Sequence, residues 1–228
     1  MTVSVALFGH WTCPFSTRVE FALAQRGIDF EMVDVPPSAV RPKEFVVPQE
    51  FLDHSPRLEV PMVRVGDDYL ADSIPVLEWL EERLDDEPLL PSEPADRALV
   101  RERVAWIDQN VFRPMVGVYY GIDPDRVARS SEKLAAALAE MAKWSTETGW
   151  LAGEGPTLAE AVLLPVYVRL DGLRALGFTH DLTPEVETHM QRCRSFRGWK
   201  RVEWTAEQLE EFVGRFNAYR RMQQRVQQ

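Results

Sequence analysis

The first 84 residues alternate between strand-like and helix-like runs. VSVALF (residues 3–8) and FEMVDV (residues 30–35) are short apolar runs with β-branched side chains, which predicts two strands. Between them, PFSTRVEFALAQRG repeats apolar residues at helical spacing and ends at a glycine. The apolar face of this predicted helix consists of Phe15, Val19, Ala22 and Leu23.

A hairpin and a second helix complete this region. PMVRV (residues 61–65) and YLAD (residues 69–72) flank a Gly-Asp turn, and Ser73 opens a helix with apolar residues three or four apart. The less regular stretch that ends near His54 is expected to contain a short helix. The predicted order is β-α-β-(α)-β-β-α, in which a right-handed crossover makes the first two strands parallel.

Beyond residue 84 the strand signals disappear. Residues 85–95 (DDEPLLPSEPA) are rich in proline and acidic side chains and have no apolar period, so they are predicted to link two domains. An α/β domain over residues 1–84 would then be followed by an all-helical domain over residues 96–228. One long helix of this second domain has an apolar face formed by Val100, Val104, Ile107, Val111, Met115 and Val118.

Two further helices are predicted in the second domain. Residues 126–149 form an amphipathic helix that Gly149 ends. Thr157, followed three residues later by Glu160, is a capping box at the start of the next helix. That helix is apolar on nearly every side, so we expect it in the middle of a bundle, and Pro165 is expected to kink it.

The net charge of −10 resides in the first part of the chain. Residues 1–90 hold 7 basic and 17 acidic side chains, whereas the other 138 residues hold 19 of each. This acidity argues against a nucleic-acid partner, because phosphate groups bind concentrated basic side chains. No run approaches the ~18 apolar residues of a membrane span. The first residues do not resemble a targeting segment either, so a cytoplasmic location is expected.

Cysteine and histidine are sparse. Cys13 and Cys193 are expected to be free thiols in a reducing compartment. The four histidines do not repeat the spacing of metal ligands, so no metal ion is expected.

Cys13 directly precedes Pro14, which suits the first position of a helix. A free thiol ionises near pH ~8.5 and is therefore mostly protonated and weakly nucleophilic at neutral pH. A helix start favours an anion, because it presents unpaired N–H groups and the positive end of the helix dipole. We therefore expect the N–H groups of Phe15 and Ser16, together with the Ser16 hydroxyl, to stabilise a Cys13 thiolate. The alternative is a small packed side chain, which is the role expected for Cys193.

Four segments, in this order, resemble glutathione transferases. TCPFSTRVEFAL is similar to the omega-like, cysteine-type branch, FLDHSPRLEVPMV to the family's Asn-Pro to Val-Pro segment, LADSIPVLEWLEERL to its Glu-Ser turn, and WLAGEGPTLAEAVLLPV to its capped central helix. The resemblance spans residues 3–176. It implies a thioredoxin-like, glutathione-binding domain over residues 1–84 and a helical bundle over residues 96–228.

The resemblance also implies a set of glutathione-binding residues. Val60 would offer its backbone to the cysteinyl part of glutathione, and Pro61 would be a cis proline that shapes the site. The carboxylate of Asp72 would face the γ-glutamyl ammonium. The hydroxyl of Ser73 and the N–H groups at the helix start would face the γ-glutamyl carboxylate. Arg41 would pair with the glycyl carboxylate.

Other interpretations of these residues stay open in the sequence. Arg41 is equally compatible with a solvated charge, Asp72-Ser73 with a plain helix cap, and Pro61 with a trans proline at a strand edge. The departures from the family pattern are Asp72 in place of glutamate, His54 in place of asparagine and Glu160 in place of aspartate.

The segment Cys-Pro-Phe-Ser has no second cysteine, so a monothiol cycle is expected. Cys13 would attack the glutathione sulfur of a mixed disulfide, and a second glutathione would release the enzyme. Phe15, two residues after Cys13, is also expected to bind glutathione. Removal of glutathione from a conjugate and reduction of dehydroascorbate fit the same site. The alternative is conjugation of glutathione to an electrophile, with Thr12 or Ser16 as the activating hydroxyl.

A hydrophobic, planar or disulfide substrate is expected to be small and to bind in a cleft between the domains. Ordinary packing in the core is the alternative role for the residues expected to line this cleft. A host that relies on another low-molecular-weight thiol would change the co-substrate. The candidate residues of the cleft are His10, Trp11, Met115 and Tyr119.

The rival hypothesis is a non-catalytic member of the same fold that binds a protein partner. FVGRFNAYRRMQQRVQQ combines four arginines with an apolar stripe and no acidic residue. Such a basic helix binds a partner or an anionic surface, or packs back on its own protein, which the acidic first domain favours. The resemblance also implies a homodimer. The stripe consists of Phe212, Phe216, Tyr219, Met222 and Val226.

Overall fold

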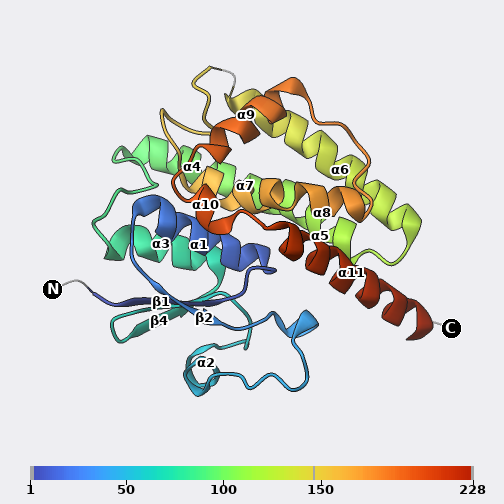
Figure 1. Ribbon diagram of the computed structural model, residues 1–228. Coiled ribbons are helices and arrows are strands. Elements are labelled where there is room, and N and C mark those ends of the chain that lie inside the picture. The colour runs from blue at the N-terminus through green and yellow to red at the C-terminus, as the bar shows by residue number, and fades with distance from the viewer. Residues whose placement is uncertain (1–2, 146, 227–228) are drawn as a thin grey trace. The chain divides into compact units, whose positions relative to one another are not determined.

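The computed structural model describes residues 3–145 and 147–226, and contacts divide the chain into two compact units (Figure 1). Unit 1 comprises Met1–Leu89 and Phe196–Val202, and unit 2 comprises Leu90–Ser195 and Glu203–Gln228. The division between Leu89 and Leu90 falls inside the predicted linker. The sequence predicts that residues 196–202 belong to the helical domain. In the structure, the segment Phe196–Val202 makes its contacts with unit 1.

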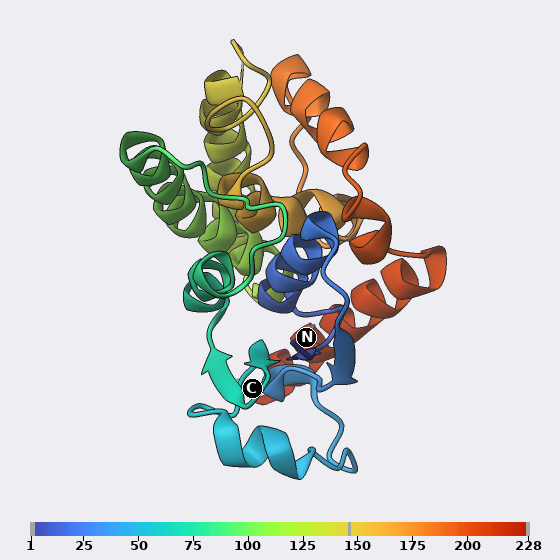
Figure 2. The ribbon, with the colours of Figure 1, turned by 90° about the vertical axis from the view of Figure 1, so that its left-hand side faces the viewer.

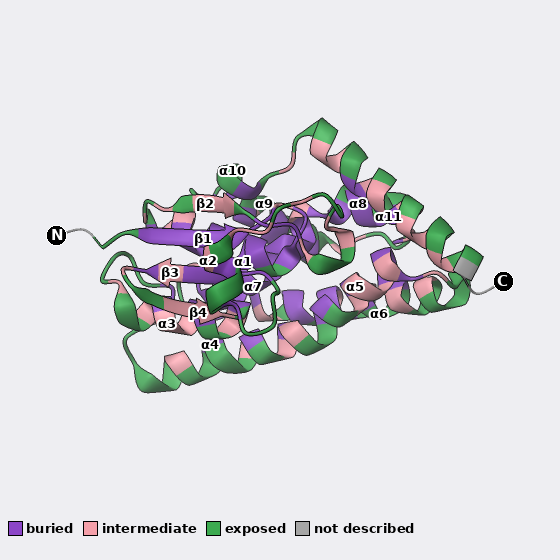
Figure 3. Ribbon diagram, turned by 90° about the horizontal axis from the view of Figure 1, so that it is seen from below, coloured by how far each residue is buried: buried purple, intermediate pink, exposed green. Residues whose placement is uncertain are grey.

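In the described part of unit 1, four strands form one mixed sheet in the order β2-β1-β3-β4. β1 (Val5–Gly9) pairs in parallel with β2 (Glu31–Asp34) and antiparallel with β3 (Met62–Val65). β3 pairs antiparallel with β4 (Asp68–Ala71). The predicted parallel pair and the predicted hairpin are confirmed. β1 is buried along its whole length (Figure 3), as expected for a central strand with both faces covered.

Helices cover both faces of this sheet (Figures 1 and 2). α1 (Pro14–Arg26) and α3 (Ser73–Arg83) lie on one face, and α2 (Gln49–His54) lies on the other. A 3₁₀ turn at Ser38–Val40 precedes α2. α1 has proline at its start and ends at Gly27, whose φ of 73° is a left-handed conformation that glycine adopts without steric cost.

α10 (Trp199–Val202) explains why the segment 196–202 belongs to unit 1. The Phe196 and Phe21 rings lie 5.8 Å apart, and the Arg201 guanidinium pairs with Glu20 of α1 at 2.9 Å. A β-carbon at position 198 would lie 2.8 Å from the Phe21 carbonyl oxygen, so a glycine is required there. The sequence could not show this return of the chain, because periodicity within a segment does not report contacts between residues about 175 positions apart.

The predicted long helix of unit 2 is interrupted. α4 (Pro94–Ile107) passes into a π-helical segment, Asp108–Phe112, and then into α5 (Arg113–Tyr120). Pro114 has no N–H for the carbonyl four residues earlier, and its ring would collide with that carbonyl in a regular α-helix. The wider π turn provides room just before the proline. The sequence pattern predicted the apolar face of this long helix but not the additional residue of its π-helical turn.

The remaining helices of unit 2 are α6 (Pro124–Ala142), α7 (Leu158–Val168), α8 (Leu170–Ala175), α9 (Pro184–Arg194) and α11 (Ala206–Val226). α6 ends before the predicted Gly149, in a 3₁₀ turn at Lys143–Ser145. α7 is buried from Leu158 to Tyr167, which confirms its predicted central place. It runs through Pro165, and the predicted kink stays a prediction.

The capping box at the start of α7 is confirmed and belongs to a larger buried network. The Glu160 carboxylate is fully buried and accepts hydrogen bonds from the Thr157 N–H and hydroxyl, both at 2.8 Å. It also accepts from the Leu151 N–H at 2.7 Å, and His189 Nε2 of α9 lies 3.7 Å away. The glutamate therefore joins the loop before α7 to α9, which a plain capping residue would not do.

α11 packs partly back on unit 2. Phe212 and Phe216 are buried, and the Phe216 ring lies 4.7 Å from Tyr119 and 4.9 Å from Tyr120 of α5. Arg220 donates to the carbonyls of Val118 and Leu176, where α5 and α8 end. Met222 is 56% exposed, and the side chain of Val226 lies outside the described residues. The first half of the predicted stripe is therefore core.

We expect Glu160→Ala to lower the free energy of unfolding by about 3 kcal/mol or more, because three buried donors lose their acceptor. Urea unfolding followed by circular dichroism measures the loss. Glu154→Ala removes the same charge from an exposed position a few residues away and should change stability by less than about 0.5 kcal/mol. Equal effects of the two substitutions would show that the network contributes no stability.

Candidate functional site

A tight turn between β1 and α1 positions Cys13. The Cys13 N–H donates to the His10 carbonyl at 2.9 Å, and the Thr12 N–H donates to His10 Nδ1 at 3.1 Å. Because the amide is a donor, Nδ1 is an acceptor, which leaves the proton of a neutral imidazole on Nε2, 3.9 Å from Asp34. His10 thus holds the turn, a role that the sequence did not predict.

Close packing of α1 on β1 brings Ser16 against Gly9. A β-carbon at Gly9 would lie 2.9 Å from the side chain of Ser16, so only glycine allows this approach. Ser16 is fully buried, and its hydroxyl has no hydrogen-bond partner among the described residues. The Ser16 hydroxyl therefore does not donate to the Cys13 sulfur in this structure, and its role toward a Cys13 thiolate stays a prediction.

The Cys13 sulfur contacts the loop before β3. The thiol donates to the Val60 carbonyl at 3.7 Å, and the residue is 4% exposed. Its side chain makes no capping hydrogen bond to the first turn of α1, all of which is described. The expected contact with the N–H groups of Phe15 and Ser16 is thus absent here, and their stabilisation of a Cys13 thiolate stays a prediction.

The same loop reaches the start of α3. The Val60–Pro61 peptide bond is cis, which confirms that prediction, and the Pro61 carbonyl accepts the Asp72 N–H at 3.2 Å. Two consecutive carbonyls therefore connect the start of α1 to the start of α3. Cys13, Val60, Pro61 and Asp72 are brought together as the sequence interpretation required.

Asp72 has an unusual backbone, with φ at 81°, a region that residues other than glycine seldom occupy. Its carboxylate pairs with Arg57 at 2.8 Å and makes no capping hydrogen bond in the described first turn of α3. A plain helix cap is thereby excluded for this side chain. Strained residues of this kind occur at ligand-binding sites, where the surrounding structure holds them.

Ser73 begins α3 and is buried. Arg18 of α1 donates to the Ser73 hydroxyl oxygen at 3.2 Å, and its guanidinium carbon lies 5.1 Å from the centre of the Phe15 ring. Phe15 is itself partly exposed, next to Cys13. One arginine therefore contacts residues at both helix starts.

Arg41 is engaged with backbone. It donates to the Pro36 carbonyl at 2.9 Å and to the Leu58 carbonyl at 3.4 Å, which connects the loop before α2 to the loop that carries Val60. It is half-buried, so the interpretation as a free surface charge is wrong. Its pairing with a ligand carboxylate stays a prediction.

The four candidates for a second-substrate cleft belong to different units. His10 and Trp11 lie in unit 1, where their rings stack at 5.5 Å. Met115 and Tyr119 lie in unit 2, and both are buried. Tyr119 packs against the aromatic rings of α11, so ordinary packing accounts for it. The cleft stays a prediction.

Cys193 has surroundings unlike those of Cys13. It is 0% exposed, and its sulfur lies 3.9 Å from His189 Nδ1. Burial, reinforced by the nearby Glu160 carboxylate, raises the pKa of the Cys193 thiol well above its usual value. Burial likewise raises the pKa of Tyr167, whose hydroxyl contacts His189 at 3.0 Å. These observations favour the predicted structural role of Cys193.

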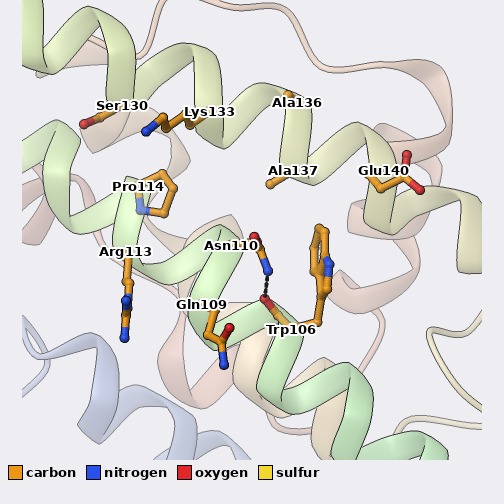
Figure 4. A pocket seen from close by; sticks show the side chains of 10 residues that line it. All are labelled: Trp106, Gln109, Asn110, Arg113, Pro114, Ser130, Lys133, Ala136, Ala137 and Glu140. Atoms are coloured by element: carbon orange, nitrogen blue, oxygen red, sulfur yellow. Dashed lines mark hydrogen bonds between the residues drawn. The ribbon is translucent and has the colours of Figure 1, made fainter.

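Unit 2 also has a cavity of about 780 Å³ along α6 and the π-helical segment (Figure 4). Trp106 and Asn110 line it from one side, and Ala137 and Glu140 from the other. It includes none of the predicted site residues. Within the described residues, no group of three or more His, Cys, Asp or Glu side chains could hold a metal ion, and no helix is long and apolar enough to cross a membrane.

Comparison with known proteins identifies the N-terminal region. A model of the glutathione S-transferase N-terminal domain matches residues 12–83, the region that contains the site in unit 1. Residues 12–83 therefore resemble a glutathione S-transferase N-terminal domain. It is 32% identical over 125 residues to glutathione S-transferase U2 of Arabidopsis thaliana, a match covering 53% of this chain and 52% of that protein. The chain spans about half the length of the first curated relatives that it matches.

Solved glutathione S-transferases share the whole fold. The rice enzyme OsGSTU1, solved in complex with glutathione, superposes with a TM-score of 0.81 at 15% identity, covering 97% of this chain and 98% of that one. Glutathione transferase Omega 3C of Trametes versicolor superposes with a TM-score of 0.80 at 18% identity, covering 99% and 93%. The glutathione S-transferase fold expected from the sequence is therefore confirmed, whereas the omega-like branch stays a prediction.

Two residues of the site were missed in the sequence, Arg18 and Arg57. Arg18 could have been recognised in the sequence, because it is a charged residue three positions after Phe15 and therefore lies on the apolar face of the helix. Arg57 left none, because its pairing with Asp72 depends on how two loops meet.

We expect a thiol reagent such as 5,5′-dithiobis(2-nitrobenzoate) to label the native protein at Cys13 at least about tenfold faster than at Cys193, because a buried thiol with a raised pKa supplies little thiolate. Peptide mass spectrometry at short reaction times distinguishes the two positions. Labelling in urea is the control, in which both thiols should react at similar rates. Faster labelling of Cys193 in the native protein would contradict the assignment.

Proposed function

We propose that this protein is a glutathione-dependent thiol transferase, in which Cys13 exchanges with glutathione mixed disulfides or glutathionyl conjugates. The observation that carries the proposal is the 3.7 Å contact between the Cys13 sulfur and the Val60 carbonyl, beside the cis proline. This contact supports Cys13 as a nucleophile beside the backbone that would hold the cysteinyl part of glutathione. The match of residues 12–83 to the glutathione S-transferase N-terminal domain supports glutathione as the co-substrate.

The surrounding groups fit the two ends of the γ-glutamyl moiety. The Asp72 carboxylate suits the ammonium, and the Ser73 hydroxyl and the amides that open α3 suit the carboxylate. Without ligand, Asp72 is neutralised by Arg57 at 2.8 Å. Arg57 is about two-thirds exposed, so exchanging it for a ligand ammonium breaks only a solvated ion pair, which costs at most about 1 kcal/mol.

The proposed reaction needs one cysteine. The Cys13 thiolate attacks the glutathione sulfur of a mixed disulfide, the S–S bond breaks, and the other thiol leaves as a thiolate that takes up a proton. The thiolate of a second glutathione then attacks the Cys13–glutathione disulfide, which yields oxidised glutathione and regenerates Cys13. Overall, one free glutathione and the mixed disulfide yield the partner thiol and oxidised glutathione, so the exchange needs no other reductant, metal or further cofactor.

The neighbouring hydroxyls fit the alternative, conjugation, less well. The Thr12 hydroxyl is bound to His10 at 2.7 Å, and Ser16 is fully buried against Gly9. Cys13 is therefore the reactive side chain best placed beside Val60. A conjugating activity would use the same glutathione site, but the nucleophile would be the sulfur of glutathione and not that of Cys13.

The partner-binding hypothesis loses support where α11 packs Phe212 and Phe216 into its own unit. The homodimer and the cytoplasmic location stay predictions. The identity of the low-molecular-weight thiol and of the second substrate also stays open to experiment.

We expect Cys13→Ser to abolish turnover of a small glutathione mixed disulfide, because a serine hydroxyl cannot form the mixed disulfide intermediate. Glutathione binding, measured by isothermal titration calorimetry, should persist within about threefold, since no binding contact is removed. Cys193→Ser is the matched control and should turn over like the unchanged protein. Normal turnover by Cys13→Ser would assign the chemistry to another group.

We expect Asp72→Asn to weaken glutathione binding by about tenfold or more, the equivalent of losing one charge-assisted hydrogen bond. Asparagine has nearly the same size and shape as aspartate, so the fold should be retained. Asp68→Asn removes an exposed carboxylate of β4 that pairs with Arg83, and it serves as the control for net charge. If both variants bind glutathione equally well, Asp72 does not contact the ligand.

A further inference from the structure

Two side-chain contacts join the loop before α2 to the loop that carries Val60. The Arg41 guanidinium donates to the Leu58 carbonyl at 3.4 Å. The Ser38 hydroxyl donates to the carboxylate of Glu59, the residue directly before Val60. A guanidinium and a carboxylate therefore lie where the same two loops meet.

The topology of the sheet directs a bound ligand toward these loops. β1, β2 and β4 run in the same direction, so the segments that follow them all begin at one edge of the sheet. The strand order β2-β1-β3-β4 places the start of α3 on one side of this edge and the loop after β2 on the other. In the proposed function, the γ-glutamyl end lies at Ser73 and the cysteinyl part at Val60. The end of the ligand beyond the cysteinyl part, its far end, then extends toward Ser38 and Glu59.

The loop from Ser55 to Val60 is held by its own hydrogen bonds. The Leu58 N–H donates to the Ser55 carbonyl at 3.2 Å, and the Ser55 hydroxyl donates to the Glu59 carbonyl at 3.3 Å. Leu58 has a φ of 54°, a left-handed conformation that residues other than glycine seldom adopt. Strained residues of this kind persist where the surrounding structure holds them, and they cluster at ligand-binding sites. The loop therefore fixes the backbone from which the Glu59 side chain extends.

The two charged groups at this place differ in their contacts. Arg41 is half-buried and uses its N–H groups on the carbonyls of Pro36 and Leu58. Glu59 is exposed, and within the described residues no arginine, lysine or histidine pairs with its carboxylate. A carboxylate has about four acceptor sites, of which the Ser38 hydroxyl takes one. Glu59 can therefore accept further hydrogen bonds from a ligand.

The charge balance disfavours a ligand carboxylate at the far end. Arg41 and Glu59 together carry no net charge, so a carboxylate there is repelled by one about as much as it is attracted by the other. Another nearby arginine, Arg57, already pairs with Asp72 at 2.8 Å. Residues 1–90 hold 17 acidic side chains against 7 basic ones, which adds to the repulsion. An uncharged group that donates hydrogen bonds fits these surroundings better than a carboxylate.

We propose that Glu59 is a specificity-determining residue: it selects thiols whose far end is uncharged and donates hydrogen bonds, over thiols whose far end is a carboxylate. This inference rests on the proposed function, which places the cysteinyl part of the ligand at Val60. Glu59 accepts amide N–H or hydroxyl groups of the ligand, and the Ser38 hydroxyl orients its carboxylate. Arg41 then connects the two loops, in place of the carboxylate pairing expected from the sequence.

The test compares two ligands on the unchanged protein and its variants. The first is reduced glutathione. The second is glutathione amide, in which a primary amide replaces the glycyl carboxylate. Both ligands carry the same γ-glutamyl and cysteinyl parts. The ratio of their dissociation constants, measured by isothermal titration calorimetry, therefore reports on the far end alone.

The unchanged protein should bind the amide about threefold to tenfold more tightly than glutathione at low ionic strength, as expected for one exposed charged contact with a hydrogen bond. Concentrated sodium chloride should weaken this preference, because Glu59 is exposed and its charge is screened. Glu59→Gln removes the charge at nearly the same shape and should reduce the preference to less than about twofold. Glu59→Lys should reverse it, so that glutathione binds more tightly than the amide.

Asp67→Asn is the matched control for net charge. Asp67 is exposed in the turn between β3 and β4, at the opposite edge of the sheet, so its loss removes one negative charge far from the ligand. This variant should keep the full preference for the amide. Substitutions at the exposed Glu59 should leave the fold intact, and unchanged melting temperatures check this. Retention of the full preference in both Glu59 variants, or tighter binding of glutathione than of the amide by the unchanged protein, would overturn the inference.

The outcomes also separate this inference from the proposed function. If both ligands bind and Cys13→Ser abolishes turnover, but the Glu59 variants leave the ratio unchanged, only the role of Glu59 is wrong. If the unchanged protein binds neither ligand, the proposed thiol site is wrong, and the assignment of Glu59 fails with it.

Discussion

The dipeptide Val60–Pro61 is the element on which the site depends, because its two carbonyls accept hydrogen bonds from the starts of two different helices. Val60 accepts the Cys13 thiol, and Pro61 accepts the Asp72 N–H. The sheet alone would fix the directions of α1 and α3, but it would not fix the distance between their first residues. This loop brings a thiol, a strained aspartate and a helix start into one small region, and it continues directly into β3.

Buried polar contacts hold this arrangement together in both units. Arg18 and Arg26 fasten α1 to α3 in unit 1, and Glu160 joins α7 to α9 in unit 2. A buried charge is unfavourable unless its partners are well placed. Each of these contacts therefore favours one alignment of the packed helices over alignments that are shifted along the helix axis. Apolar packing stabilises the core without that selectivity, because leucine and valine accept many alternative arrangements.

Local patterns predicted most of the fold, and contacts between distant segments were what they missed. The strands, the hairpin, the capping box at Thr157 and the buried helix after it were all evident from spacing and residue type. The π-helical segment at Asp108–Phe112 was missed because one extra residue hardly disturbs an apolar period. The return of Phe196–Val202 to unit 1 was missed because periodicity carries no information about partners far along the chain. In the site, the residue types were predictable, whereas the pairing of Arg57 with Asp72 was not.

The contact between Cys13 and Val60 links ligand binding to the state of the sulfur. The hydrogen bond requires a proton on the sulfur, and a thiolate would instead face the negative end of the carbonyl dipole. In the proposed function, an amide of glutathione takes the same carbonyl as its acceptor. A bound glutathione would therefore compete with the Cys13 thiol for the Val60 carbonyl. A sulfur displaced from this carbonyl still lies at the start of α1, whose first amides are the groups expected from the sequence to stabilise a thiolate.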